Sequence, residues 1–260
     1  MKSAAMRIAS LSPAITEILF ALGREKQIVC TDQFSDWPEK AKILPHLKDH
    51  QKINIATLRE YQADLIFTST LVQQKLAEQL KADGLPVVHQ DPRSLGDIYE
   101  NIRTLGMLLE AEPEARELIA RMQFGFSQVK KKVGILSKRF KVYVEEWHNP
   151  PMVSGNWVPE VVQMAGGIPL SLPRGSASRE VTLHEVQTFN PDMIVLSICG
   201  AGSAANKSLI DLRAGWKDLP AVLKGRVFVI DDSLLNRPGP RLVEGAQRLY
   251  GWMFQLAHGG

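Results

Sequence analysis

The sequence has little of what several functional classes need. It holds only two cysteines, Cys30 and Cys199, which are too few for an all-cysteine metal site. Because each closes an apolar run far from the other, we expect two buried thiols, with a disulfide as the alternative. No stretch of about 18 apolar residues occurs, so we expect no membrane-spanning segment.

A strong charge of one sign is also missing. The formal net charge is only +3, and the one dense basic run is residues 130–132 (KKK). This run falls in a helical pattern, which predicts a solvated helix face rather than a nucleic-acid surface. With 45% apolar residues, the chain can bury a sizeable core. A globular protein is therefore expected.

An uninterrupted leader segment is lacking as well. Residues 1–22 carry early positive charge, but Ser10, Ser12, Thr16 and Glu17 interrupt the apolar stretch. No small-residue cleavage site follows it. We expect a cytoplasmic protein as the sequence stands, or a periplasmic or cell-surface protein if a leader was removed.

Catalytic and nucleotide-binding motifs are absent. Residues 200–208 (GAGSAANKS) resemble a phosphate loop, but Asn206 stands where glycine must precede Lys207, so we predict only a flexible turn. Neither a dinucleotide fingerprint nor a nucleophile elbow occurs. Glu145 and Glu146 are adjacent in a strand pattern and would lie on opposite faces. Of the six histidines, only His46 and His50 have a spacing that would place two ligands on one helix face, and the segment from Pro45 that holds them is expected to be a loop. We therefore expect a protein that is not an enzyme and has no metal site of its own.

Short apolar runs alternate with helical patterns along the whole chain. We predict strands at 7–11, 28–30, 64–67, 86–89, 141–145, 192–197 and 226–230, and helices at 12–22, about 95–110, 158–165, 183–189 and 240–257. This β-α alternation predicts an α/β fold with mainly parallel sheets. The stretch 112–138 is rich in helix formers and too long for an ordinary crossover. We therefore predict two Rossmann-like lobes, 1–111 and 139–260, joined by one long rigid helix at 112–138.

Aromatic and polar residues gather just after the predicted strands. Phe34, Trp37, Trp147 and Trp157 follow strands, where open α/β sheets present ligands. Pro13 and Thr16 lie at a helix start, and Asn156 is expected to cap the helix that follows it. Together with Arg237 they predict an apolar-walled cleft between the lobes, suited to a large planar ligand.

Four motifs carry a family resemblance over nearly the whole chain. They are residues 7–23 (RIASLSPAITEILFALG), 35–38 (SDWP), 155–160 (GNWVPE) with 165–167 (AGG), and 236–245 (NRPGPRLVEG). The chain resembles the helical-backbone (class III, TroA-like) substrate-binding proteins of ABC importers, above all their cobalamin-binding branch. The resemblance implies two α/β lobes, one rigid connecting helix, a shallow cleft and no catalysis.

The resemblance also implies roles for single residues. The family's corrin-contacting aromatics match Phe34 and Trp147, and further aromatic positions fall on His50, Ser69 and Arg174. The family docks on its permease through one exposed glutamate in each lobe. Glu180 matches the C-terminal one, whereas Ala56 stands at the N-terminal position.

The leading hypothesis is a monomeric binding protein for cobalamin or a related corrinoid. Aromatic contacts would come from the residues above, and polar contacts from Asn156, Asn236, Arg237 and the loop backbone after Cys199. His50 or His148 could ligate the cobalt ion, because neutral imidazole suits such a metal. The alternatives are a ferric siderophore or haem as cargo on the same scaffold, or an intracellular corrinoid chaperone or enzyme accessory.

Overall fold

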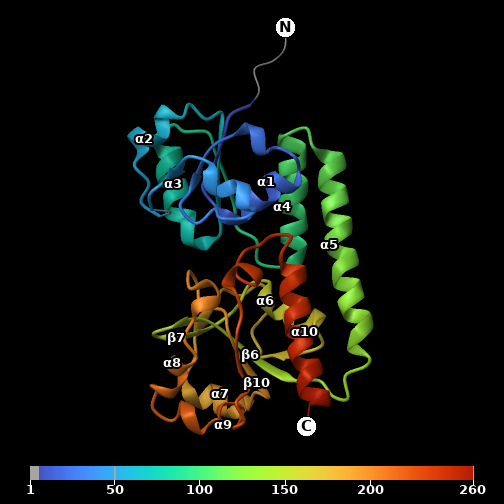
Figure 1. The fold of residues 1–260 in the computed structure, drawn as a ribbon. Helices are drawn as coiled ribbons and strands as arrows, with labels where there is room; N and C mark the ends of the chain where they lie inside the picture. Colours follow the sequence, from blue (N-terminus) through green and yellow to red (C-terminus); the bar gives the residue numbers. More distant parts are fainter. Residues whose placement is uncertain (1–5, 50, 260) are drawn as a thin grey trace. The chain divides into compact units, whose positions relative to one another are not determined.

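The computed structural model describes residues 6–49 and 51–259 of the chain, drawn in Figure 1. These form two compact units: unit 1 comprises the described residues up to Pro92 and Gly96–Ala120, and unit 2 comprises Arg93–Leu95 and the described residues from Arg121 onward. Each unit is an α/β structure, so the predicted fold class is confirmed.

The sheet of unit 1 is entirely parallel. Its strands are β1 (Ile8–Ser10), β2 (Ile28–Asp32), β3 (His46–Leu47), β4 (Leu65–Ser69) and β5 (Val87–Gln90), in the spatial order β3-β2-β1-β4-β5. The order reverses between β1 and β4, and open α/β sheets bind ligands at the carboxyl ends of strands beside such a point. Residues 46–47, expected in a loop, pair instead with the end of β2.

The helices of unit 1 are α1 (Pro13–Ala21), α2 (Ile55–Glu60), α3 (Gln74–Ala82) and α4 (Leu95–Leu108). Helix α1 begins with Pro13 at its first position, where a missing N–H costs no hydrogen bond, and Gly23 follows it with φ +68°. Its residues from Ala14 to Leu19 are all buried, so α1 is a core helix. It packs against β1, β2 and β4.

The long helix α5 (Glu112–Val133) contains the boundary between the units. It has acidic residues in its first turn and lysines 130–132 in its last, both favourable to the helix dipole. These lysines are exposed, as predicted. The helix ends at Val133 rather than at residue 138, because Gly134 follows and Leu136 donates to the carbonyl of Val133 in a tighter turn.

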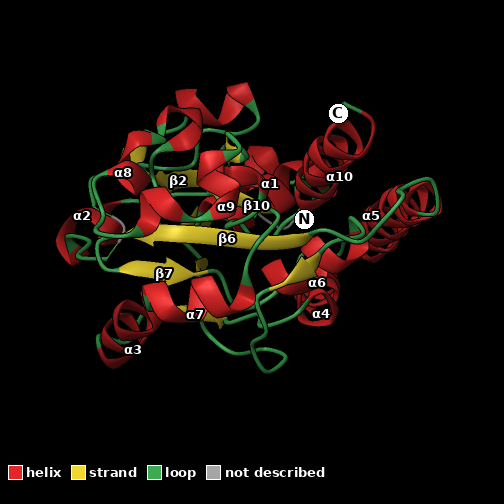
Figure 2. Ribbon diagram, turned by 90° about the horizontal axis from the view of Figure 1, so that it is seen from below, coloured by secondary structure: helices red, strands yellow, loops and turns green. Residues whose placement is uncertain are grey.

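Unit 2 has a mixed sheet in the order β11-β10-β6-β7-β9, with β8 pairing with β6. The strands are β6 (Lys141–His148), β7 (Pro151–Val153), β8 (Ile168–Pro169), β9 (Arg179–Glu180), β10 (Met193–Leu196) and β11 (Val227–Val229). Strand β6 is parallel to β8 and β10 and antiparallel to β7, beside which it lies in Figure 2. It extends beyond its partner β10, which ends opposite Glu145, so the end of β6 projects past the parallel sheet.

The helices of unit 2 are α6 (Val158–Met164), α7 (Leu183–Phe189), α8 (Ser208–Asp211), α9 (Pro220–Leu223) and α10 (Leu242–His258). Helix α10 packs on α6. Each unit has its own apolar cluster, around Leu11 and Ile66 in unit 1 and around Ile194 and Leu196 in unit 2. Within residues 6–49 and 51–259, no helix combines the length and apolarity needed to cross a membrane.

Candidate functional site

A chain of buried hydroxyl groups shapes the first candidate surface in unit 1. Thr16 is fully buried, and its Oγ1 lies 2.8 Å from the Oγ atoms of both Ser10 and Ser35. Ser35 in turn donates to Asp32 at the end of β2. Thr16 therefore positions the loop after β2 from within the core, while Pro13 beside it is half-buried.

That loop presents two aromatic side chains. The backbone N–H of Phe34 donates to Asp32 Oδ2 at 3.2 Å, which fixes the first turn of the loop. Phe34 is 39% exposed and Trp37 is 45% exposed. Large apolar side chains cost free energy when exposed to water, so this exposure favours a binding role at the carboxyl end of the sheet.

Two other predicted positions of unit 1 have different outcomes. His50 lies outside the described residues, so its proposed contact and cobalt ligation stay predictions. Ser69, at an aromatic position of the resembling family, is 2% exposed at the end of β4. Its backbone N–H donates to Gln73 Oε1 at 2.8 Å, so it belongs to the packed interior.

A buried ion pair supports the carboxyl end of β6 in unit 2. Glu145 is fully buried and accepts from both terminal nitrogens of Arg213 at 2.7 Å and from Tyr143 Oη at 2.9 Å. Arg213 Nη2 also donates to the carbonyl oxygen of His148 at 2.9 Å. This arginine thus ties the end of β6 to the segment after α8.

The end of β6 carries the aromatic side chain of unit 2. Trp147 is 42% exposed, and its Nε1 donates to the carbonyl of Asn149 at 2.9 Å. The ring of His148 lies 5.7 Å from that of Trp147, centroid to centroid. His148 is half-buried, and its Nδ1 has no hydrogen-bond partner within the described part of the chain.

Glu146 has surroundings different from those of its neighbour. Burial raises the pKa of Glu146 above its ordinary value, while a hydrogen bond with Ser178 opposes the rise. Glu145 instead contacts Tyr143 and Arg213. The two carboxylates have separate partners, as expected for adjacent strand residues, and do not form an acid-base pair.

The segment after β7 differs from the sequence-based expectation. Asn156 has φ +53° and is not the helix cap, because Trp157 occupies that position. The Asn156 side chain accepts instead from Arg93 Nη1 at 3.1 Å. Trp157 is only 4% exposed and donates to the carbonyl of Leu235 at 2.7 Å. We therefore assign Trp157 to the core, since it has little ring surface to offer a ligand.

Polar groups at the end of β10 bond mainly to one another. Asn236 accepts from Ser197 Oγ at 2.8 Å and donates to the Ser197 carbonyl and to Cys199 Sγ. Asp232 accepts from the backbone N–H groups of Gly200 and Gly202, so this part of the loop after Cys199 already has an internal acceptor. Arg237, next in sequence, is half-buried.

The two cysteines are free thiols with different exposure. Cys30 is buried, as expected. The expectation of burial is wrong for Cys199, which follows β10 and is exposed. Desolvation by its neighbours, followed by the carboxylates of Glu146 and Asp232, raises the pKa of Cys199 to about 12. The thiol is therefore protonated at neutral pH and a poor metal ligand. No group of three or more metal-ligating side chains occurs in residues 6–49 and 51–259.

The sequence did not predict the contacts that hold the loop at 172–178. Arg93 bonds to Asn156, and Glu160 accepts from Arg174 Nε at 2.7 Å and from the backbone N–H of Leu95 at 2.8 Å. Arg93 and Arg174 are far apart in sequence and belong to no local motif. No sequence signal could have joined them.

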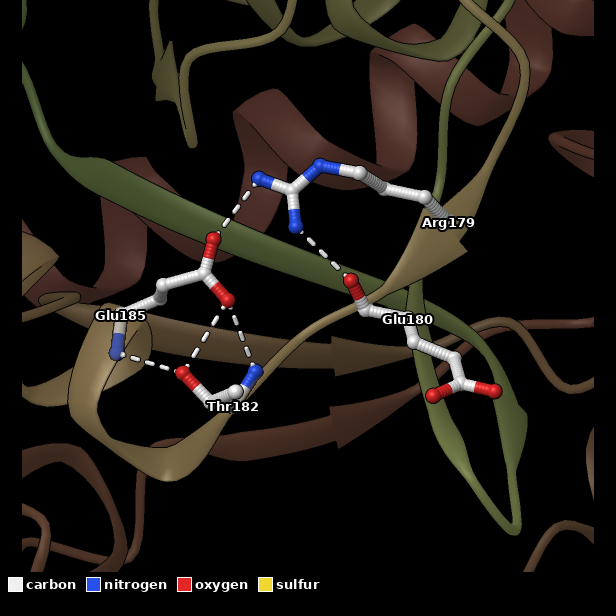
Figure 3. Close-up of polar contacts among 4 residues, drawn as sticks. All are labelled: Arg179, Glu180, Thr182 and Glu185. Atoms are coloured by element: carbon white, nitrogen blue, oxygen red, sulfur yellow. Dashed lines mark hydrogen bonds and ion pairs between the residues drawn. The ribbon is translucent and has the colours of Figure 1, made fainter.

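Glu180, the predicted docking residue, lies on the short strand β9 and is exposed. Figure 3 shows Arg179 donating to Glu185 and to the backbone carbonyl of Glu180, and Thr182 forming a capping box with Glu185. The Glu180 carboxylate is directed away from these three side chains. Ala56 is exposed on α2.

Comparison with known proteins gives matches over almost the whole chain. Residues 8–234 match the family model described as periplasmic binding protein. The vitamin B12-binding protein of Yersinia pestis is 28% identical over 95% of this chain and 85% of its own length. The ABC transporter substrate-binding lipoprotein YvrC of Bacillus subtilis is 25% identical over 96% of this chain and 80% of its own.

A solved structure agrees in fold. The apo form of the periplasmic heme-binding protein RhuT from Roseiflexus sp. RS-1 aligns with a TM-score of 0.84 and 22% identity, over 98% of this chain and 100% of its own. The fold and the extent of the family match lead to one conclusion. The chain belongs to the periplasmic binding protein family, whose members are non-enzymatic substrate-binding proteins.

Proposed function

We propose that this substrate-binding protein carries cobalamin or a related corrinoid, for uptake or for handling within the cell. The observation that carries the proposal is the exposure of Phe34, Trp37 and Trp147, each about two-fifths exposed in a segment at the carboxyl end of a parallel strand. The 28% identity with a vitamin B12-binding protein supports this choice of cargo. The cleft expected between the lobes stays a prediction.

The chemistry of these side chains suits a wide, flat and largely apolar ring. Contacts between flat rings and aromatic side chains contribute about 0.5 to 1.5 kcal/mol per pair beyond the burial of area. Three such contacts and the desolvation of the aromatic surfaces can support micromolar binding, about 8 kcal/mol, if the loops are ordered beforehand. The buried Thr16 hydroxyl chain and the Glu145–Arg213 pair supply such order.

We further propose that His148 ligates the cobalt ion of the bound corrinoid. Its ring lies beside that of Trp147, and because its Nδ1 is buried without a hydrogen-bond partner within the described residues, Nε2 would be the ligating nitrogen. Hydroxocobalamin has a ligand that imidazole can replace, so binding should shift its visible spectrum. The His148→Ala variant should bind hydroxocobalamin without that shift. If the variant instead gives the same bound spectrum as the wild type, His148 does not ligate the cobalt ion.

For docking, we propose that Glu180 contacts a basic residue of an ABC permease. Its exposed carboxylate and its fixed strand, anchored by the Thr182 capping box, support this role. Glu180→Ala should reduce stimulation of the transporter's ATPase while leaving ligand affinity unchanged. Equal stimulation by both proteins would contradict the proposal.

A ferric siderophore or haem is the second candidate cargo, because Arg174 is 77% exposed and could meet an anionic complex. Titration calorimetry with cyanocobalamin, hydroxocobalamin, haem and a ferric hydroxamate separates the candidates. Heat and tryptophan quenching with the cobalamins alone would support the proposal. Binding of haem or the hydroxamate alone would replace it with the second candidate.

A further inference from the structure

A turn in unit 2 displays Arg174 at its corner. The Ser176 N–H donates to the Pro173 carbonyl at 3.1 Å, and Gly175 has φ +74°, the pattern of a type II turn with glycine at its third position. The turn is tied to the segment after β7, because the Asn156 N–H donates to the Ser176 carbonyl at 2.6 Å. Arg174 thus projects from an anchored backbone, although its side chain is 77% exposed.

The Arg174 guanidinium is held by a single hydrogen bond within the described residues, through its Nε atom. Its Nε donates to Glu160 Oε1 at 2.7 Å, and Glu160 is itself held through Oε2 by the Leu95 N–H at 2.8 Å. Within the described residues, Arg174 has no other hydrogen-bond acceptor. The two terminal nitrogens therefore remain available, and they can grip a carboxylate or phosphate in a bidentate manner.

A second arginine flanks the same turn. Arg93 Nη1 donates to Asn156 Oδ1 at 3.1 Å, and a Cβ atom added to Gly175 would lie 3.4 Å from the Arg93 Cβ. Arg93 is thus a second arginine that is fixed against the backbone of this turn through Asn156.

We propose that Arg174, with Arg93 beside it, binds an anionic group on the cargo. The inference rests on the proposed function and adds to it a polar subsite for a carboxylate or a phosphodiester. A phosphodiester would come from the nucleotide loop of a complete corrinoid, and a carboxylate from an unamidated side chain at the edge of the ring. Both present paired oxygens with the spacing of a guanidinium edge.

A purely structural role for this cluster makes a different prediction. If Arg174 served only to fasten the turn, its loss would weaken every ligand alike and would lower stability. A ligand-binding role instead makes the loss depend on the charge of the ligand and on ionic strength. The affinities of charged and uncharged corrinoids therefore separate the two roles.

The experiment is titration calorimetry of three corrinoids against four proteins. Cyanocobalamin carries the phosphodiester, cobyric acid carries one free carboxylate, and dicyanocobinamide carries neither. The proteins are the wild type, Arg174→Gln, Arg174→Lys and Lys131→Gln, the last being a control that removes one exposed charge from α5. Thermal unfolding of each variant reports any effect on stability.

We expect Arg174→Gln to weaken binding of one anionic ligand by about three- to tenfold and to leave dicyanocobinamide unaffected. Arg174→Lys should recover part of the loss, and Lys131→Gln should bind like the wild type. A loss for cyanocobalamin alone identifies the phosphodiester, and a loss for cobyric acid alone identifies the carboxylate. Either result supports the inference.

Two results would overturn it in distinguishable ways. Equal affinity of wild type and Arg174→Gln for all three ligands, or an equal loss for all three, removes the subsite but leaves the corrinoid function standing. No binding of any corrinoid by the wild type removes both proposals together.

Discussion

Replacing Glu145 by glutamine tests the buried ion pair that supports the end of β6. The substitution keeps the volume of the side chain but removes the charge that faces Arg213. Glu145 is fully buried, and the side chain of Arg213 is 15% exposed, so water can compensate little of the loss. Leaving one member of a buried pair uncompensated costs about 3 to 5 kcal/mol. Because glutamine can still accept one hydrogen bond, we expect Glu145→Gln to lower the free energy of unfolding by about 3 kcal/mol.

That magnitude is a large share of the stability of a domain, which is about 5 to 15 kcal/mol. Urea unfolding followed by tryptophan fluorescence measures it. Trp216 is a local reporter, because the Arg213 guanidinium lies 4.8 Å from the centroid of its ring. The exposed pair of Lys42 and Glu39, 2.9 Å apart, gives the control: Glu39→Gln should cost less than about 1 kcal/mol.

The double variant Glu145→Gln with Arg213→Met separates pairing from burial. Once Arg213 is gone, the loss of the Glu145 charge leaves no cation unpaired, so the two costs should not add. We expect the loss in free energy of unfolding of the double variant to be smaller, by about 2 kcal/mol or more, than the summed losses of the two single variants. Additive costs, or a Glu145→Gln cost no larger than that of Glu39→Gln, would refute the reasoning.

Three further predictions concern other parts of the chain. Hydrogen bonds from the Thr182 backbone and from Arg179 lower the pKa of Glu185 to about 2, so its contribution to stability is present above its ordinary value near 4.5 and is lost as the pH falls toward 2. Glu185→Gln should cost about 1 kcal/mol at pH 7 and progressively less in acid, and a cost independent of pH would contradict this. At pH 8, iodoacetamide should alkylate Cys199 about fifty- to a thousandfold more slowly than a small thiol, because the pKa of Cys199 is about 12. Mass spectrometry measures the rate, and a rate equal to that of a small thiol would contradict the prediction. Gly155→Ala should displace the loop at 172–178, because the added Cβ would lie 2.5 Å from the Ala177 carbonyl carbon, and a thermal midpoint equal to that of the wild type would contradict the packing.

The sequence predicts the two lobes and the long helix because these depend on local patterns. Apolar runs bounded by glycine and proline mark the strands, and Pro13 with Gly23 marks the two ends of α1. The end of α5 is missed by five residues, because residues 134–138 continue the helix-forming composition while the backbone after Gly134 turns away. Local composition does not reveal where tertiary contacts stop supporting a helix.

The candidate site is only partly predictable for the same reason. Phe34 and Trp37 are exposed in the loop after β2, as the pattern predicts, and Trp147 is exposed within the last residues of β6, which is longer than predicted. Trp157, predicted in an equivalent setting, is buried against Leu235. The pairing of Glu145 with Arg213 spans 68 residues, and no periodicity connects them. Burial and long-range pairing depend on how elements pack, which a single sequence does not encode in any short motif.

The most direct test of the corrinoid function is calorimetric titration with cyanocobalamin, using wild-type protein and the Trp147→Ala and Phe124→Ala variants. Phe124 is the matched control, because it is an exposed aromatic on α5 outside the strand-end loops. We predict micromolar or tighter binding to the wild type and to Phe124→Ala, and binding weaker by about tenfold for Trp147→Ala. The absence of heat with wild-type protein at high micromolar ligand, or equal affinity of all three proteins, would contradict the account.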